Sequence, residues 1–296
     1  MLSLKSFAMN TPYFISLLPL VLALSSCGKI EPNTVATAPP FLPNAPAKTE
    51  EAIRKDFPGA IPGHEFSDSL IHYLQKKYKI EPDKILLGAS TCVDDIIYTK
   101  NFHFHPEIKG PFHLGGLAGL PFTGISGLDA FAHHIPDSGT LVLLVEPHIG
   151  YSEKKGWGFV LRHEQPEASS CCGALMGTLG KLQAGTLKAD LSEDDYQGGK
   201  IAELALRYKS EILDAEIPII ELTRITSLSA EKQISAHVLD VSLEHAKYIV
   251  IITGVIINTD FSFTDYQYMD HIQIYDVRKK SFVEDLRNPQ GLTSAH

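Results

Sequence analysis

Short apolar runs recur along the chain and predict buried strands. Residues 84–88 (KILLG) and 140–146 (TLVLLVE) are such runs, and residues 248–257 (YIVIITGVII) form a longer one. Runs of this length between turn residues are typical of strands buried on both faces of a sheet. Residues 157–162 and 271–277 are further candidate strands.

Apolar residues at helical spacing alternate with these runs. Ser67 is a candidate cap for a helix that ends near Lys79, residues 172–182 begin a plausible second helix, and residues 195–215 form a longer amphipathic one. The glycine-rich residues 101–127 favour a loop with little regular structure. Strands separated by helices predict an α/β domain with a mostly parallel central sheet flanked by helices.

The N-terminus has the pattern of an export signal. Residues 14–24 (FISLLPLVLAL) have the length of a signal peptide and are short for a membrane span. Small residues precede Cys27 and resemble the bacterial lipobox, in which the cysteine carries lipid; an ordinary cleaved signal is the alternative. We expect a lipoprotein signal peptide over 1–26, a proline-rich tether over 27–49 and the α/β domain over 50–296, on a lipid-anchored protein of the cell envelope that faces the periplasm.

Composition narrows the function further. The apolar share of 44% and charged share of 21% are those of an ordinary globular protein. A net charge of −9 excludes a broad electrostatic surface for nucleic acid. Four cysteines in 296 residues are too few for a disulfide scaffold.

Two of the predicted strands end at groups that bind metals. Cys92 and His148 each follow a buried strand, and Cys172 opens a helix, where a thiolate is favoured. Two cysteines and one histidine would leave the fourth zinc position open, as in catalytic sites. The spacings are long, however, so two other interpretations stay open: buried thiols beside a loop histidine, or a disulfide from Cys92 to Cys171 or Cys172.

Five segments together resemble one protein family, the low-CO2-inducible protein B family classed with the theta carbonic anhydrases. They are STCVDDI (90–96), GGLAGLPFTGISGLDAFAHHIPDSG (115–139), LLVEPHIGYS (143–152), FVLRHEQ (159–165) and CCGAL (171–175). The resemblance implies a fold like that of beta carbonic anhydrases, zinc bound by Cys92, His148 and Cys172, and assembly as a homodimer. It also implies the reversible hydration of CO2 to bicarbonate by zinc-bound hydroxide.

The resemblance assigns catalytic roles and exposes one departure. Asp94 is the expected acceptor that orients the zinc-bound hydroxide, and an arginine normally pairs with it. That arginine position of the beta pattern is Ile96 here, so Arg162 is the candidate replacement. A catalytically weak zinc protein that binds CO2 or bicarbonate, or acts as a scaffold, is the alternative function. A purely structural lipoprotein with disulfide-bonded cysteines is the third.

Other conspicuous residues receive structural interpretations. His133 and His134 are expected to be structural or to line the cleft, with one of them a candidate proton shuttle. The glycines of 115–127 are expected to let the backbone pass close to the site. The aromatic segment 261–268 is interpreted as an edge or dimer contact.

Overall fold

The computed structural model describes residues 42–97 and 106–287. The predicted signal peptide, the predicted lipid attachment site Cys27 and the tether as far as residue 41 lie outside the described residues. The first helix, α1 (Ala47–Asp56), begins three residues before the predicted start of the domain. Within the described part of the chain, no helix is long and apolar enough to span a membrane.

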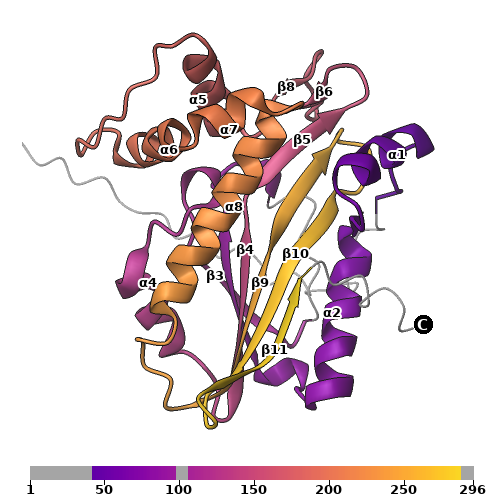
Figure 1. Ribbon diagram of the computed structural model, residues 1–296. Helices are drawn as coiled ribbons and strands as arrows, with labels where there is room; N and C mark the ends of the chain where they lie inside the picture. Colours follow the sequence, from indigo (N-terminus) through magenta and orange to yellow (C-terminus); the bar gives the residue numbers. More distant parts are fainter. Residues whose placement is uncertain (1–41, 98–105, 288–296) are drawn as a thin grey trace, which may run out of the picture. The chain divides into compact units, whose positions relative to one another are not determined.

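A central sheet organises the described residues (Figure 1). Its strand order is β1-β10-β9-β4-β2-β3, β11 pairs with β10, and β5 pairs with β9 and β6. The strands are β1 (Ile61–Pro62), β2 (Ile85–Thr91), β3 (Lys109–His113), β4 (Gly139–Glu146), β5 (His148–Ser152), β6 (Gly156–Trp157), β9 (Ala246–Thr259), β10 (Tyr266–Asp276) and β11 (Ser281–Arg287). A separate ribbon pairs β7 (Phe159–Val160) with β8 (Ser169–Ser170), so the strand predicted over 157–162 is broken into short pieces.

The prediction of a mostly parallel sheet is only partly correct. β2 pairs in parallel with β3 and β4, and β9 pairs in parallel with β4 and β5. The C-terminal part is antiparallel, because β10 pairs in that sense with β9, β11 and β1. Only residues 260–265 connect β9 to β10, which is too short for the crossover that a parallel pair requires. The sheet is therefore mixed.

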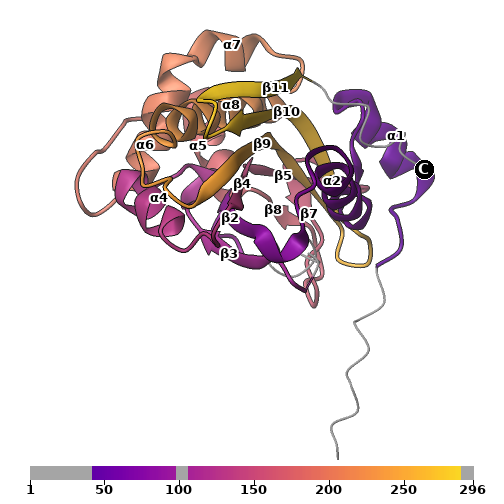
Figure 2. The same cartoon turned by 90° about the horizontal axis from the view of Figure 1, so that it is seen from below.

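Helices cover both faces of the sheet (Figure 2). The side chains of β4 divide between two apolar clusters, one on each face. Val142 and Leu144 pack in one apolar cluster with Phe66 of helix α2 (Gly63–Tyr78). Leu141 and Leu143 belong to a second cluster, which includes residues of the helices on the opposite face. Those helices are α4 (Gly124–Ala132), α5 (Gly173–Gln183), α6 (Tyr196–Arg207), α7 (Lys209–Asp214) and α8 (Pro218–His237).

Several segments differ from the sequence predictions. Ser67 lies inside α2 instead of capping it, because that helix begins at Gly63. The helix expected over 195–215 divides at Tyr208, whose φ of −107° separates α6 from α7. The segment 101–127 contains β3 and the start of α4, so it has more regular structure than a loop. Helix α8 was not predicted because its buried face carries hydroxyl groups, which hide the apolar periodicity. Thr223 and Thr226 satisfy theirs on backbone carbonyls one turn earlier.

Tyr266 is one residue of the segment 261–268 that is not available for the predicted edge or dimer contact. It begins β10, is fully buried, and pairs with Pro62 of β1. Its hydroxyl donates to Glu50 of α1. The aromatic ring at this position therefore belongs to the core of the chain itself.

Candidate metal centre

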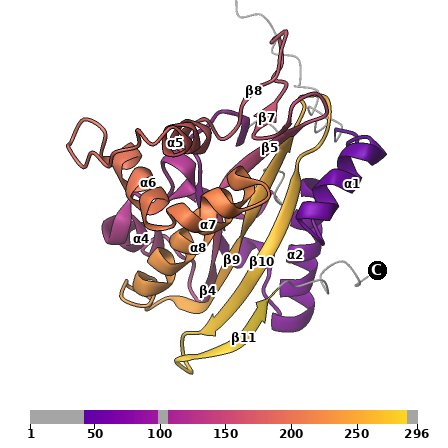
Figure 3. The same cartoon turned by 45° about the horizontal axis from the view of Figure 1, so that its top comes forward.

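The carboxyl ends of two adjacent strands hold two of the predicted ligands. Cys92 follows β2, and His148 opens β5 directly after β4 and Pro147. The parallel register pairs Thr91 with Glu146, so the two strands end side by side. Cys172 comes from another part of the chain and occupies the N-cap position of α5. Figure 3 turns this end of the sheet, with β5 and α5, toward the viewer.

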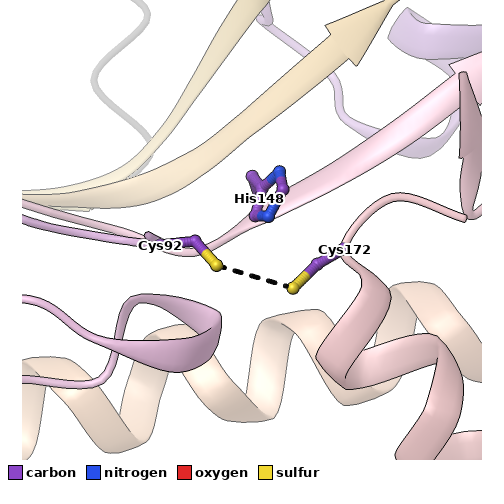
Figure 4. A group of neighbouring side chains, drawn as sticks. All are labelled: Cys92, His148 and Cys172. Carbon is purple, nitrogen blue, oxygen red and sulfur yellow. Dashed lines mark hydrogen bonds between the residues drawn. The ribbon is translucent and has the colours of Figure 1, made fainter. Parts of the chain in front are cut away.

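The structure brings Cys92, His148 and Cys172 together, as Figure 4 shows. The two Sγ atoms lie 3.8 Å apart, and one ligand atom from each residue lies within 4.8 Å of the others. All three side chains are at least 98% buried. Among the described cysteines none is disulfide-bonded, so the structure has free thiols where the alternative interpretation had a disulfide.

The polar atoms of this cluster fit a zinc ion. His148 Nε2 is buried and has no hydrogen-bond partner among the described residues, although leaving such an atom unpaired costs about 1–3 kcal/mol. The hydrogen bond with Cys172, together with burial, raises the pKa of the Cys92 thiol. A thiolate here therefore needs a compensating cation. Two sulfur ligands and one imidazole nitrogen are a donor set that zinc accepts in catalytic sites.

Asp94 lies beside this cluster and is held by Arg162. Arg162 Nη2 donates to both Asp94 carboxylate oxygens at 2.9 Å, and its Nη1 donates to Asp95 at 2.6 Å. Asp94 Oδ2 lies 3.9 Å from His148 Nε2. Burial alone would raise the pKa of Asp94, but Asp95, His148 and Arg162 together lower it. Asp94 is therefore an ionised acceptor that faces the cluster.

The arginine that pairs with Asp94 comes from a loop, not from position 96. Ile96 is buried, and its backbone amide donates to Asp94 Oδ1 at 3.3 Å. Arg162 follows β7, in the FVLRHEQ segment that the sequence comparison had singled out. The predicted replacement is thus in contact with Asp94.

Cys171 lies on the other side of the His148 ring. Its Sγ is 3.5 Å from Nδ1 of His148 and donates to Asn258 Oδ1 at 3.4 Å. Asp94, His148 and Cys171 form a second group whose ligand atoms are close together, but it shares His148 with the first group. The Nδ1 that Cys171 faces is already 2.7 Å from Asn258 Oδ1. We therefore take Cys92, His148 and Cys172 as the better metal-binding set.

Two residues next to the site were missed by sequence reasoning. Asn258 lies beside His148, and Asp265 holds Asn258, yet Asn258 is 110 residues from His148 along the chain. The only signal was a polar residue just after the predicted strand 248–257. In contrast, His133 and His134 are exposed at the end of α4 and are not part of either ligand group.

Glycine is required where a loop passes the end of β2. A Cβ at Gly115 would lie 2.0 Å from the carbonyl oxygen of Thr91, the residue before Cys92. Gly150 is also confined, since its Cβ would lie 2.8 Å from that of Cys171. The expectation that the 115–127 glycines allow close backbone approach is confirmed at Gly115.

Comparisons with known proteins agree on one family. Residues 60–276 match the family described as limiting CO2-inducible proteins B/C beta carbonic anhydrases. The crystal structure of PtLCIB4, a homolog of the limiting CO2-inducible protein LCIB, matches with a TM-score of 0.69 and 25% identity, over 80% of this chain and 99% of that chain. The crystal structure of LCIB matches with a TM-score of 0.60 and 17% identity, over 81% and 99%, and shares the fold. No curated protein matches the chain.

Proposed function

Because the chain belongs to the family of limiting CO2-inducible proteins B/C and beta carbonic anhydrases, we propose that it is a zinc-dependent carbonic anhydrase that reversibly hydrates CO2 to bicarbonate. The observation that carries this proposal is the buried group of Cys92, His148 and Cys172 next to an ionised Asp94. The three ligands leave one zinc position for water, which is the arrangement of catalytic zinc sites.

Each residue of the site has a separate task. Cys92, His148 and Cys172 would hold the zinc, which when bound supplies hydroxide at neutral pH by lowering the pKa of water towards 7. Asp94 accepts a hydrogen bond and thereby orients the attacking group. Arg162 holds Asp94 through both carboxylate oxygens, which keeps it ionised and keeps it from becoming a fourth ligand.

Metal content and CO2 hydration test the proposal. Purified protein is expected to contain about one zinc ion per chain, and stopped-flow hydration of CO2 with a pH indicator should show turnover. Cys92→Ser should lose both zinc and activity. Cys171→Ser makes the same change on the other side of the His148 ring and should keep its zinc. Wild-type protein that binds no zinc, or a fully active Cys92→Ser variant, would refute the assignment.

The departure at Ile96 supports a second candidate function. A homologue that binds zinc and takes up CO2 or bicarbonate without efficient turnover would need the same ligands but not the arginine at that position. The two functions differ in one measurement, because only the enzyme accelerates CO2 hydration. Zinc-loaded protein without measurable hydration would favour the second function.

We also propose that Cys27 carries a lipid that anchors the protein in the cell envelope, facing the periplasm, and that the domain works as a homodimer. The lipobox pattern before Cys27 supports the anchor, and the family resemblance supports the dimer. Labelling of wild-type cells with a fatty-acid analogue should mark the protein, and Cys27→Ala should abolish the label. Sedimentation of the zinc-loaded domain should give the mass of two chains.

A further inference from the structure

A buried chain of hydrogen bonds runs from His148 away from the two sulfur atoms. His148 Nδ1 lies 2.7 Å from Asn258 Oδ1, and Asn258 Nδ2 donates to Asp265 Oδ2 at 2.9 Å. All three residues are fully buried. The sheet creates this contact, because β5 lies beside the end of β9 and pairs Gly150 with Asn258.

The chemistry of Asp265 fixes the direction of every bond in this chain. Its Oδ1 accepts the backbone N–H of Thr259 at 2.8 Å, and its Oδ2 accepts from Asn258. The group that Asn258 turns toward Asp265 is therefore its NH2, and its oxygen faces His148. An oxygen can only accept, so Nδ1 of His148 must carry the ring hydrogen. The Nε2 lone pair then remains free.

Cys171 supports the same orientation of the amide. Its thiol donates to Asn258 Oδ1 at 3.4 Å, from the side of the ring opposite to the proposed metal position. Oδ1 is thus placed between a thiol donor and an imidazole donor. If the amide were turned round, its NH2 would face the thiol and the imidazole, and its oxygen would face Asp265.

We propose that Asn258 and Asp265 are positioning residues that select the tautomer of His148 able to bind the metal. The proposal rests on the proposed function, since it concerns the same site. Neither residue touches the metal position. They act through His148, by keeping the hydrogen on Nδ1 and the Nε2 lone pair directed toward the sulfur atoms of Cys92 and Cys172. Groups that orient a ligand in this way typically change metal affinity about 10–100-fold.

Replacing one carboxylate oxygen of Asp265 by an NH2 group tests this chain of hydrogen bonds, which we call the relay. In Asp265→Asn the oxygen that accepts the Thr259 amide is retained, so the new NH2 faces Asn258. Asn258 must then turn its oxygen toward residue 265 and its NH2 toward His148, which moves the ring hydrogen to Nε2. We expect zinc affinity, measured by competition with a chromophoric chelator, to fall about 10–100-fold.

The reversed pair provides the rescue. In the double variant Asn258→Asp and Asp265→Asn, a carboxylate faces His148 and accepts from both neighbours, so Nε2 is free again. Zinc affinity should return close to the wild-type value, and the absorption spectrum of the cobalt-substituted protein should return with it. A merely structural role would make the double variant at least as defective as the single one.

The tautomer can also be read directly in the wild-type protein. In metal-free protein with 15N-labelled histidine, the His148 signals, assigned by their absence in His148→Gln, should show hydrogen on Nδ1. Hydrogen on Nε2, wild-type zinc affinity in Asp265→Asn, or a double variant no tighter than Asp265→Asn would each overturn the relay. Wild-type protein that binds no zinc would instead refute the proposed function, while the tautomer would still be measurable.

Discussion

Removing the Arg162 side chain should leave the metal in place and reduce turnover. Arg162→Ala eliminates the 2.9 Å contacts to both Asp94 oxygens, at a place where the two side chains are only 19% and 15% exposed. One nitrogen makes both contacts, so we count one charged interaction, which contributes about 2 kcal/mol. Asp94 Oδ2 is already 3.9 Å from His148 Nε2, so an unrestrained carboxylate can reach the metal position.

The size of the effect follows from that free energy. A loss of about 2 kcal/mol changes the ratio of free to metal-directed Asp94 about 30-fold. Because only the fraction of protein with free Asp94 turns over, kcat should fall by up to about 30-fold. Stopped-flow CO2 hydration on samples with equal zinc content measures it. Arg162→Lys keeps the charge but not the planar fork that also reaches Asp95, so its rate should be intermediate.

A control and a refuting result complete this test. Arg278 is exposed and contacts Ser138, so Arg278→Ala should leave hydration unchanged. If zinc-loaded Arg162→Ala turned over as fast as the wild type, Arg162 would have no part in the mechanism. If it lost its zinc as well, the pair of Arg162 and Asp94 would be supporting the ligands instead.

Three further predictions concern stability. Lys77 and the hydroxyls of Tyr73 and Tyr78 surround the Glu284 carboxylate. Burial raises the pKa of Glu284, but these three partners outweigh it, so the pKa is lowered. The carboxylate therefore stabilises the fold above the usual glutamate pKa, and this stabilisation is lost as pH falls through the lowered pKa. Urea unfolding should show Glu284→Gln about 1–3 kcal/mol less stable at neutral pH, with a difference that disappears in acid; a constant difference would contradict this. Gly115→Ala should destabilise the protein by about 1–3 kcal/mol through its clash with Thr91, whereas Gly177→Ala on α5, where a Cβ meets nothing within 4 Å, should be neutral or stabilising. Free zinc at about 100 times its Kd should add about 2.7 kcal/mol to the unfolding free energy, and a chelator should remove it, whereas no change in the thermal midpoint would mean that the folded chain does not bind zinc.

The parts of the fold and of the site that the sequence predicts are those that depend on local patterns. Unbroken apolar runs identified β2, β4 and β9, and the ends of the first two strands located Cys92 and His148. The start of α5 located Cys172. These predictions depend on short stretches of chain, because the residues that form the pattern are the same residues that form the strand or the start of the helix.

The parts that were not predicted depend on pairing between distant segments. Nothing near Asn258 in sequence reveals that β9 extends past β4 to lie against β5. The antiparallel half of the sheet arises from the short connection before Tyr266. The apolar runs alone do not indicate this direction, because they fit parallel and antiparallel pairing equally well. The pair of Arg162 and Asp94 is predicted by the family resemblance and by no local pattern, because 68 residues separate the two side chains.

The length of β9 also constrains when the site can mature during synthesis. Its fourteen residues lie between β4 and β10 and then continue beside β5, so they join both halves of the sheet. The three proposed ligands are all synthesised by residue 172, but Asn258 and Asp265 follow much later. A nascent chain that ends before β9 has the cysteines and the histidine without the central strand or the groups that orient the ring. Because contacts so distant in sequence form slowly, metal loading should be a late event that reports completion of the fold.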